Sequence, residues 1–81
     1  MPRVVRLDDV WRMLDTCLAG YQKISKPHRW NVKHAGRVYH EVPLGKHGAR
    51  QNPEVESGHI RGLVKFFGIP KECYERFVNI H

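Results

Sequence analysis

Apolar residues recur at helical spacing near the start of the chain. They follow Asp8, a suitable N-cap, and Asp9, whose charge suits the positive end of a helix dipole. The apolar face of this segment contains Val10, Met13, Leu14, Cys17 and Leu18. Gly20 supplies a C-terminal stop, because glycine readily adopts the left-handed backbone that ends many helices. We predict a helix over about Asp9 to Ala19.

After this helix, apolar and polar residues alternate as they do in strands. Tyr21–Ile24 predicts one short strand, and Lys26–Pro43 predicts a hairpin. A three-residue loop, His34-Ala35-Gly36, fits the turn when Gly36 is left-handed. That register places six side chains on one face: His28, Trp30, Val32, Val38, His40 and Val42. A two-residue turn would break this agreement, because a one-residue slip moves side chains to the opposite face.

A loop and two helices follow the predicted hairpin. Pro43 to Pro53 contains two glycines and two prolines, which indicates a loop. The next helix opens at Glu56 or Ser57 and ends at Gly68. Its apolar stripe consists of Ile60, Leu63, Val64 and Phe67. Ile69-Pro70 breaks the helix, because proline fits its first position and little else here. The short final helix contains Cys73, Tyr74, Phe77 and Ile80. No internal repeat is evident.

These elements predict a single α+β domain over residues 1–81, in the order α-β-β-β-α. Strands flanked by helices favour a three-stranded antiparallel sheet with helices packed on one face, the last helix being broken at Gly68-Pro70. No apolar run approaches the roughly 20 residues that a membrane-spanning helix needs. No apolar signal segment precedes the first acidic residues, so we expect a cytoplasmic protein. We therefore expect Cys17 and Cys73 to be buried, reduced thiols, with a single disulfide between the terminal helices as the alternative.

The charge of the chain, +6 overall, is concentrated in its middle. Residues 20–53 carry seven basic residues against Glu41 alone, while the segments on either side are balanced. Four of the six histidines also lie there: His28, His34, His40 and His47. Local positive charge favours a polyanionic partner such as RNA. The histidines have neither an accompanying cysteine nor an i, i+4 helical pair, so we predict no metal site.

Several motifs occur in an order that is typical of one family. They are Gly20-Tyr21, His28 eight residues before Gly36, Val42-Pro43-Leu44, Ser57-Gly58-His59-Ile60-Arg61-Gly62-Leu63 and Phe67-Gly68-Ile69. In this order the chain resembles the HicA toxin family, small domains with a double-stranded-RNA-binding-like (dsRBD-like) fold. Members have Gly-Ser-His before the hairpin, Val-Pro at its end, and a helix that begins Pro-Gly-Thr-Leu-Arg and ends Ala-Gly-Ile. The resemblance covers roughly Asp8 to Phe77.

The resemblance implies the toxin of a bacterial or archaeal type II toxin–antitoxin system. Such toxins are ribosome-independent mRNA interferases, and a HicB antitoxin neutralises them by covering the RNA-cleaving surface. The family histidine aligns with His28, and no metal or cofactor is implied. Metal-free RNA cleavage needs a base, an acid and positive charge at the phosphate. His40 is a candidate partner for His28, although we favour a structural cross-strand contact for it. The candidate phosphate contacts are Lys26, Arg29, Lys33, Arg37, Lys46 and Arg50.

The chain departs from the family pattern at one position that bears on activity. Lys26-Pro27 replaces Gly-Ser directly before His28, and proline fixes a backbone that glycine leaves free. This departure favours the alternative function, a non-catalytic RNA-binding or antitoxin-binding module of the same fold. Trp30 can stack on a base, but its alternation with polar neighbours favours packing in the core against the helices.

Overall fold

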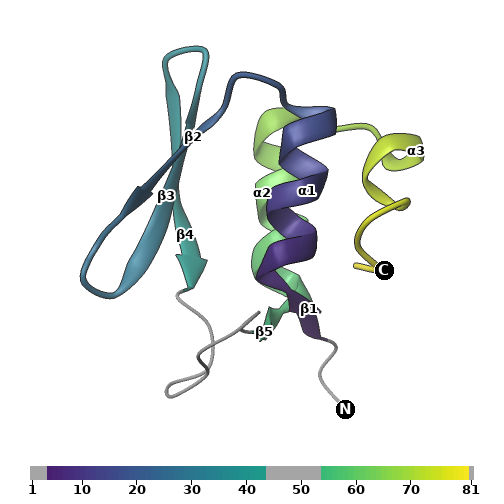
Figure 1. Cartoon of the computed structure of the whole chain (residues 1–81), viewed down its shortest axis with the longest axis horizontal. Helices are drawn as coiled ribbons and strands as arrows, with labels where there is room; N and C mark the ends of the chain where they lie inside the picture. Colours follow the sequence, from purple (N-terminus) through teal and green to yellow (C-terminus); the bar gives the residue numbers. More distant parts are fainter. Residues whose placement is uncertain (1–3, 44–53, 81) are drawn as a thin grey trace.

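A short strand leads into a helix near each end of the chain, and a three-stranded sheet lies between these units (Figure 1). The computed structural model describes residues 4–43 and 54–80. Its elements are β1 (Val4–Arg6), α1 (Leu7–Cys17), β2 (Gln22–Ser25), β3 (Arg29–His34), β4 (Arg37–Pro43), β5 (Glu54–Glu56), α2 (Ser57–Phe67) and α3 (Lys71–Tyr74). The predicted order is therefore present, with β1 and β5 added. Three residues are too few for an alternating pattern to reveal a strand.

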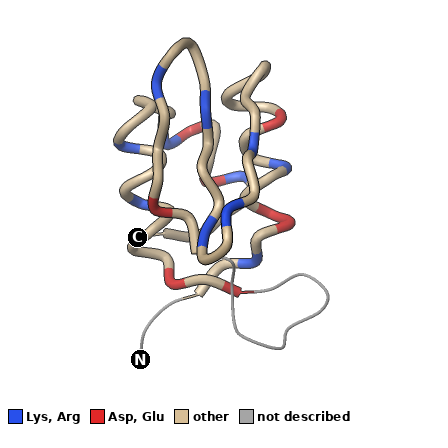
Figure 2. The backbone as a smooth tube through the Cα atoms, turned by 90° about the vertical axis from the view of Figure 1, so that its left-hand side faces the viewer, with Lys and Arg blue, Asp and Glu red and all other residues tan. Residues whose placement is uncertain are grey.

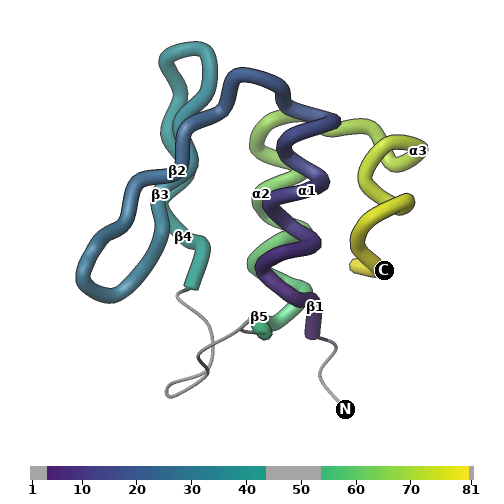
Figure 3. Tube along the Cα trace, viewed as in Figure 1, coloured from purple at the N-terminus to yellow at the C-terminus, as the bar shows by residue number. Residues whose placement is uncertain are grey.

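The main sheet has the strand order β2-β3-β4, and both pairs are antiparallel. Helices α1 and α2 lie on one face of this sheet, and α3 lies on the far side of α1 (Figures 1 and 3). The opposite face carries no helix among the described residues. The predicted α+β class and the placement of the helices are confirmed, and most of the predicted Pro43–Pro53 loop lies outside the described residues.

The turn between β3 and β4 has two residues, and the predicted three-residue loop is wrong. His34 pairs with Arg37, and the residues between them have positive φ, 51° at Ala35 and 80° at Gly36. Positive φ at both central positions is the type I′ geometry, which matches the twist of a hairpin. Val32 consequently pairs with Tyr39 rather than with Val38.

A β-bulge in β4 then shifts the pairing by one residue, so that Val42 lies on the same side of the sheet as Trp30. Trp30 pairs with Val42, so one residue of β3, Asn31, faces two of β4, His40 and Glu41. The side facing the helices carries Lys23, Trp30, Val32, His34, Arg37, Tyr39 and Val42. We call the other side the open face; it carries Gln22, Ile24, Arg29, Asn31, Lys33 and Val38. The predicted common face of the hairpin is therefore wrong for Val38.

Helix α1 begins at Leu7, two residues before the predicted start. Its N-cap is Arg6 in an extended conformation without a side-chain cap, while Asp8 and Asp9 lie in the first turn. There the carboxylates favour the positive end of the helix dipole. The helix starts early because β1 ends at Arg6 and leads directly into it. Leu7, the first helical residue, is buried and only 2% exposed.

The units β1–α1 and β5–α2 correspond to each other at an offset of 50 residues. Each has a three-residue strand with the same burial pattern and an eleven-residue helix. The buried positions match in turn: Val5 and Val55, Leu7 and Ser57, Val10 and Ile60, Met13 and Leu63, Leu14 and Val64. The strands pair antiparallel about Val5 and Val55. This is an internal structural repeat that sequence inspection missed, because the shared feature is burial rather than identity.

The C-terminal segment returns to the body of the domain. Gly68 is left-handed, with φ 68°, and ends α2 as predicted. Helix α3 covers only Lys71–Tyr74 and is shorter than the predicted final helix. The segment beyond it is nevertheless fixed, because Ile80 is buried and its carbonyl accepts a hydrogen bond from Arg61 Nε at 3.1 Å.

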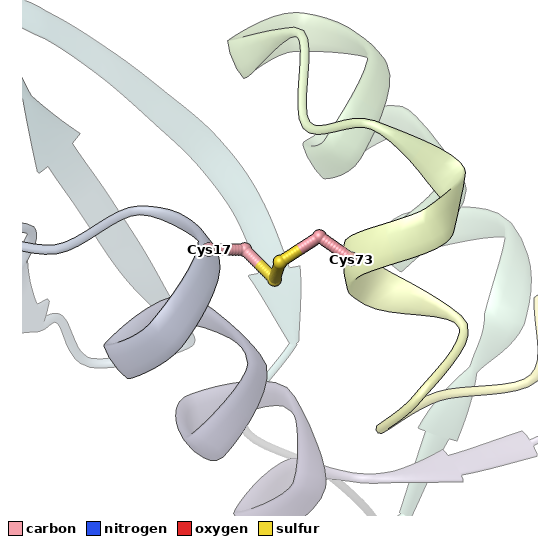
Figure 4. Close-up of a disulfide and its surroundings, with 2 residues drawn as sticks. All are labelled: Cys17 and Cys73. Atoms are coloured by element: carbon pink, nitrogen blue, oxygen red, sulfur yellow. A yellow bond between two sulfur atoms is a disulfide. The ribbon is translucent and has the colours of Figure 1, made fainter.

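A disulfide joins the end of α1 to α3. Cys17 and Cys73 are bonded, with their Cα atoms 6.0 Å apart (Figure 4). The preferred expectation of two reduced thiols is therefore wrong, and the alternative is correct. Sequence spacing could not decide this, because pairing depends on how α3 returns to α1. No helix in residues 4–43 and 54–80 is long and apolar enough to cross a membrane.

Candidate nucleic-acid interface

His28 lies in the turn between β2 and β3, and its side chain is exposed. The backbone N–H of Lys26 donates to the carbonyl of Arg29 at 2.9 Å and closes this turn. Pro27 restricts the backbone directly before the histidine. The imidazole is therefore accessible to a bound molecule and is carried by a turn whose ends are fixed by the β2–β3 pairing.

The structure does not bring His28 and His40 together. His28 precedes the Arg29–Pro43 pair, whereas His40 lies in the bulge opposite Asn31. Three positions along β3 separate them, about 10 Å at 3.3 Å per residue. The predicted common face is therefore wrong for this pair, because His28 lies outside the strand.

Two of the predicted phosphate contacts flank His28 at the same end of the sheet. Lys26 is in the turn, and Arg29 begins β3. Arg29 Nε donates to Asn31 Oδ1 at 3.3 Å along the open face. Lys33 is also on the open face, but near the opposite end of β3. The open face therefore carries positive charge along its length, with two cations beside the histidine.

Arg37 lies on the other side of the sheet. Its guanidinium carbon is 4.2 Å from the centroid of the Phe66 ring in α2. Phe66 also contacts Tyr39, with ring centroids 5.4 Å apart. Arg37 therefore packs where β4 contacts α2, on the side of the sheet opposite to Lys33. Lys46 and Arg50, the other two predicted contacts, lie outside the described residues.

Figure 2 shows the sheet from its open side, where basic segments predominate. Strands β2 to β4 and their turns carry five basic residues, and Glu41 is their one acidic residue. The other acidic residues of the described ranges are on α1, on β5, and in or directly after α3, away from this face. The excess of basic residues in the middle of the sequence therefore lies on the sheet, and most of the acidic residues lie on the helical side.

Sequence reasoning missed one basic residue that the structure brings into a distinct site. Lys23 Nζ lies 4.6 Å from the ring centroid of Trp11 and 5.5 Å from that of Trp30. Trp11 comes from α1 and Trp30 from β3, so they are remote in sequence. Alternation does place Lys23 on the same side as Val32 and Trp30, and this signal was available. The expected core packing of Trp30 is confirmed, although the ring is only partly buried.

A shallow hollow adjoins the bulge of β4. It has a volume of about 260 Å³ and is lined by Val38, Tyr39, His40, Glu41 and Phe66. His40 therefore faces a small, mainly apolar recess rather than the turn that carries His28.

His34 has a structural position, since its Nε2 is 3.2 Å from the carbonyl oxygen of Ala19 and its ring packs edge-on against Phe67. Within the described ranges, no three His, Cys, Asp or Glu side chains gather as a metal site.

Comparisons with protein-family models, with curated proteins and with solved structures found no match to this chain.

Proposed function

We propose that this chain is the toxin component of a type II toxin–antitoxin system, a HicA-like, ribosome-independent mRNA interferase. The observation that carries the proposal is the position of His28, exposed in a turn between two cations at one end of a positively charged sheet face. The dsRBD-like assignment of the fold is part of the same proposal. So are a HicB-like antitoxin that covers this face and a cytoplasmic setting in a bacterium or archaeon, where a disulfide such as Cys17–Cys73 is rare except in hyperthermophiles.

In the proposed reaction, His28 exchanges a proton with RNA at the scissile phosphate. Histidine suits this role because its ordinary pKa lies near neutrality. Lys26 and Arg29 stabilise the charge that develops on the phosphate oxygens in the transition state. Lys33 contacts the backbone of the bound RNA further along the open face, and Lys46 and Arg50 remain contacts predicted from sequence. No metal or cofactor takes part in the proposed reaction.

The alternative function is a non-catalytic RNA-binding or antitoxin-binding module. Two observations favour it. Pro27 restricts the turn that carries His28, and His40 lies about three positions further along the sheet, in the bulge of β4. A histidine without a second acid–base group must use water or the RNA itself for the other proton transfer.

Purified protein incubated with an mRNA transcript separates the two functions. We expect cleavage by the wild type in the presence of a chelator, none by His28→Ala, and wild-type cleavage by His40→Ala. Wild-type protein that binds the transcript without cleaving it would establish the non-catalytic module. Equal cleavage by His28→Ala would remove this histidine from the reaction.

A further inference from the structure

Three aromatic rings and one ammonium group meet where α1 packs against the sheet. The rings are Trp11, Tyr21 and Trp30, and all three are partly buried at the edge of the core. The ring centroids of Trp11 and Trp30 are 5.5 Å apart in an edge-to-face arrangement. Trp11 and Tyr21 are nearly parallel, 10° between planes, with centroids 6.4 Å apart. We call these rings, together with Lys23, the aromatic cluster.

The aromatic cluster is only partly buried, and solvent reaches it from the side of β2. Lys23, which lies over both indole rings, belongs to β2, an edge strand whose residues are all exposed. An exposed lysine side chain therefore lies over part of the surface of both indole rings. Such a side chain exchanges rotamers readily, so the indole faces are reachable without unfolding any element.

From this arrangement we propose that the aromatic cluster is a subsite for an unpaired base of single-stranded RNA. A base stacks on the indole face of Trp11 in place of the Lys23 ammonium, and the released ammonium pairs with a phosphate of the same strand. Proteins that bind single strands combine aromatic platforms with a positively charged path in this way. The inference rests on the proposed function and specifies its substrate as single-stranded.

The surrounding charges indicate along which side of the aromatic cluster the RNA backbone runs. Asp15 interacts with the Tyr21 hydroxyl on the α1 side of the cluster. That carboxylate repels phosphate, so the backbone must run along the β2 side, where Lys23 and Lys26 lie. The same path leads toward the turn that carries His28. Base stacking and the candidate catalytic group are thus on one continuous edge of the sheet.

Two other ligands fit the rings less well. In an RNA duplex the bases are stacked inside the helix, and proteins recognise it mainly through phosphates and 2′-hydroxyl groups. Aromatic faces would add nothing to that recognition. A quaternary ammonium ligand suits aromatic cages, but here it would have to displace Lys23 and enter a positively charged edge.

Tryptophan fluorescence of the full chain tests the subsite directly. The probes are a single-stranded 2′-O-methyl RNA, which cannot be cleaved through its 2′-oxygen, the corresponding duplex, and choline. We expect the single strand to quench the fluorescence and to bind more tightly than the duplex, and choline to have no effect. Trp11→Leu should weaken binding of the single strand by about 5- to 100-fold, as loss of one base–aromatic stack does. Trp11→Phe should retain most of the affinity.

Lys23→Gln provides a test that leaves the core untouched. We expect its affinity for the single strand to depend less steeply on salt, by about 0.7 in the logarithmic slope for one lost phosphate contact. Lys71→Gln, which removes the same charge from α3, is the matched control and should keep the wild-type slope. Thermal melting shows whether each variant is folded. If Trp11→Leu does not fold, the salt dependence of Lys23→Gln alone tests the subsite.

The outcomes separate this inference from the proposed function. If the wild type binds RNA with a steep salt dependence but without quenching, and if Lys23→Gln and Lys71→Gln have equal slopes, the subsite is wrong and the proposed function stands. If the duplex binds more tightly, or if choline quenches, the subsite has a different ligand and the inference is overturned. If neither form of RNA binds, both proposals fail.

Discussion

The hydroxyl group of Tyr39 occupies the space that a side chain on Gly62 would need. A Cβ atom built on Gly62 would lie 2.5 Å from Tyr39 Oη, closer than such atoms approach in proteins. The same hydroxyl donates a hydrogen bond to the carbonyl of His59 at 3.0 Å. The absence of a side chain at Gly62 therefore lets β4 pack directly against α2.

Gly62→Ala should consequently destabilise the domain, although alanine favours helices. We expect a net loss of up to about 2 kcal/mol, because overpacking costs about 1–3 kcal/mol and the gain in helix propensity offsets only about 1 kcal/mol of it. Tyr39→Phe alone should cost about 1 kcal/mol through the lost hydrogen bond. Urea unfolding followed by circular dichroism measures both changes.

The combination of the two substitutions supplies the sharper test. Without the hydroxyl, the nearest atom to the new methyl group is the ring Cζ of residue 39, at 3.6 Å in the present structure, which is ordinary contact. In the Tyr39→Phe background, Gly62→Ala should therefore stabilise the protein. Gly58→Ala, which meets nothing within 4 Å, is the control and should stabilise in both backgrounds. If Gly62→Ala still destabilises the Tyr39→Phe variant, the clash is not with the hydroxyl.

The disulfide is expected to contribute a large share of the stability. Cys17 and Cys73 are separated by 56 residues, and the chain-entropy account of a loop of this length gives about 4 kcal/mol. Reduction of the wild type, or the double substitution Cys17→Ser and Cys73→Ser, should therefore shift the urea midpoint markedly downward. The double variant should not respond to reductant. A wild type that unfolds at the same urea concentration with and without reductant would contradict the bond or its contribution.

The order of the helices and the main strands could be predicted because their signals are local. Periodicity revealed α1 and α2, and Gly68 marked the end of α2 through its backbone freedom. The hairpin register could not be predicted, because the β-bulge at His40 and Glu41 compensates for a turn one residue shorter than expected. The disulfide and the aromatic cluster depend on long-range packing, which no local pattern encodes. For the candidate site, the positive charge of the sheet was foreseeable, whereas the place of His28 in a turn, its separation from His40 and the contact of Arg37 with Phe66 were not.

Tyr21 should make the stability depend on alkaline pH. Burial, and then the nearby Asp15 carboxylate through its charge and its hydrogen bond, raise the pKa of Tyr21 to about 12 from its ordinary value of 10. The folded state therefore holds the phenolic proton more tightly than the unfolded state does. Its contribution to stability is complete below pH 10, and it is lost as the pH rises to about 12.

Two measurements check this pH dependence. The ultraviolet absorbance of tyrosinate should show a late-ionising phenol that is missing in Tyr21→Phe, while Tyr39, whose pKa is also raised by burial and then by Glu41, still ionises late in that variant. Asp15→Asn should bring the pKa of Tyr21 back toward its ordinary value and flatten the alkaline loss of stability. An unchanged titration in Asp15→Asn would assign the shift to burial alone.

Lys33 and Arg37 are close in sequence but lie on opposite sides of the sheet, and we expect their substitutions to have different effects. Lys33 is exposed on the open face, whereas the guanidinium of Arg37 stacks on Phe66. Lys33→Gln should reduce the salt dependence of RNA binding by about one phosphate contact, or roughly 0.7–0.9 in the logarithmic slope, and leave the stability unchanged. Arg37→Gln should lower the free energy of unfolding by about 0.5–1 kcal/mol, the usual range for an exposed cation–π contact, and have the smaller effect on the slope. Because both substitutions remove one positive charge, equal changes in slope would mean that RNA responds to the net charge of the sheet rather than to its open face.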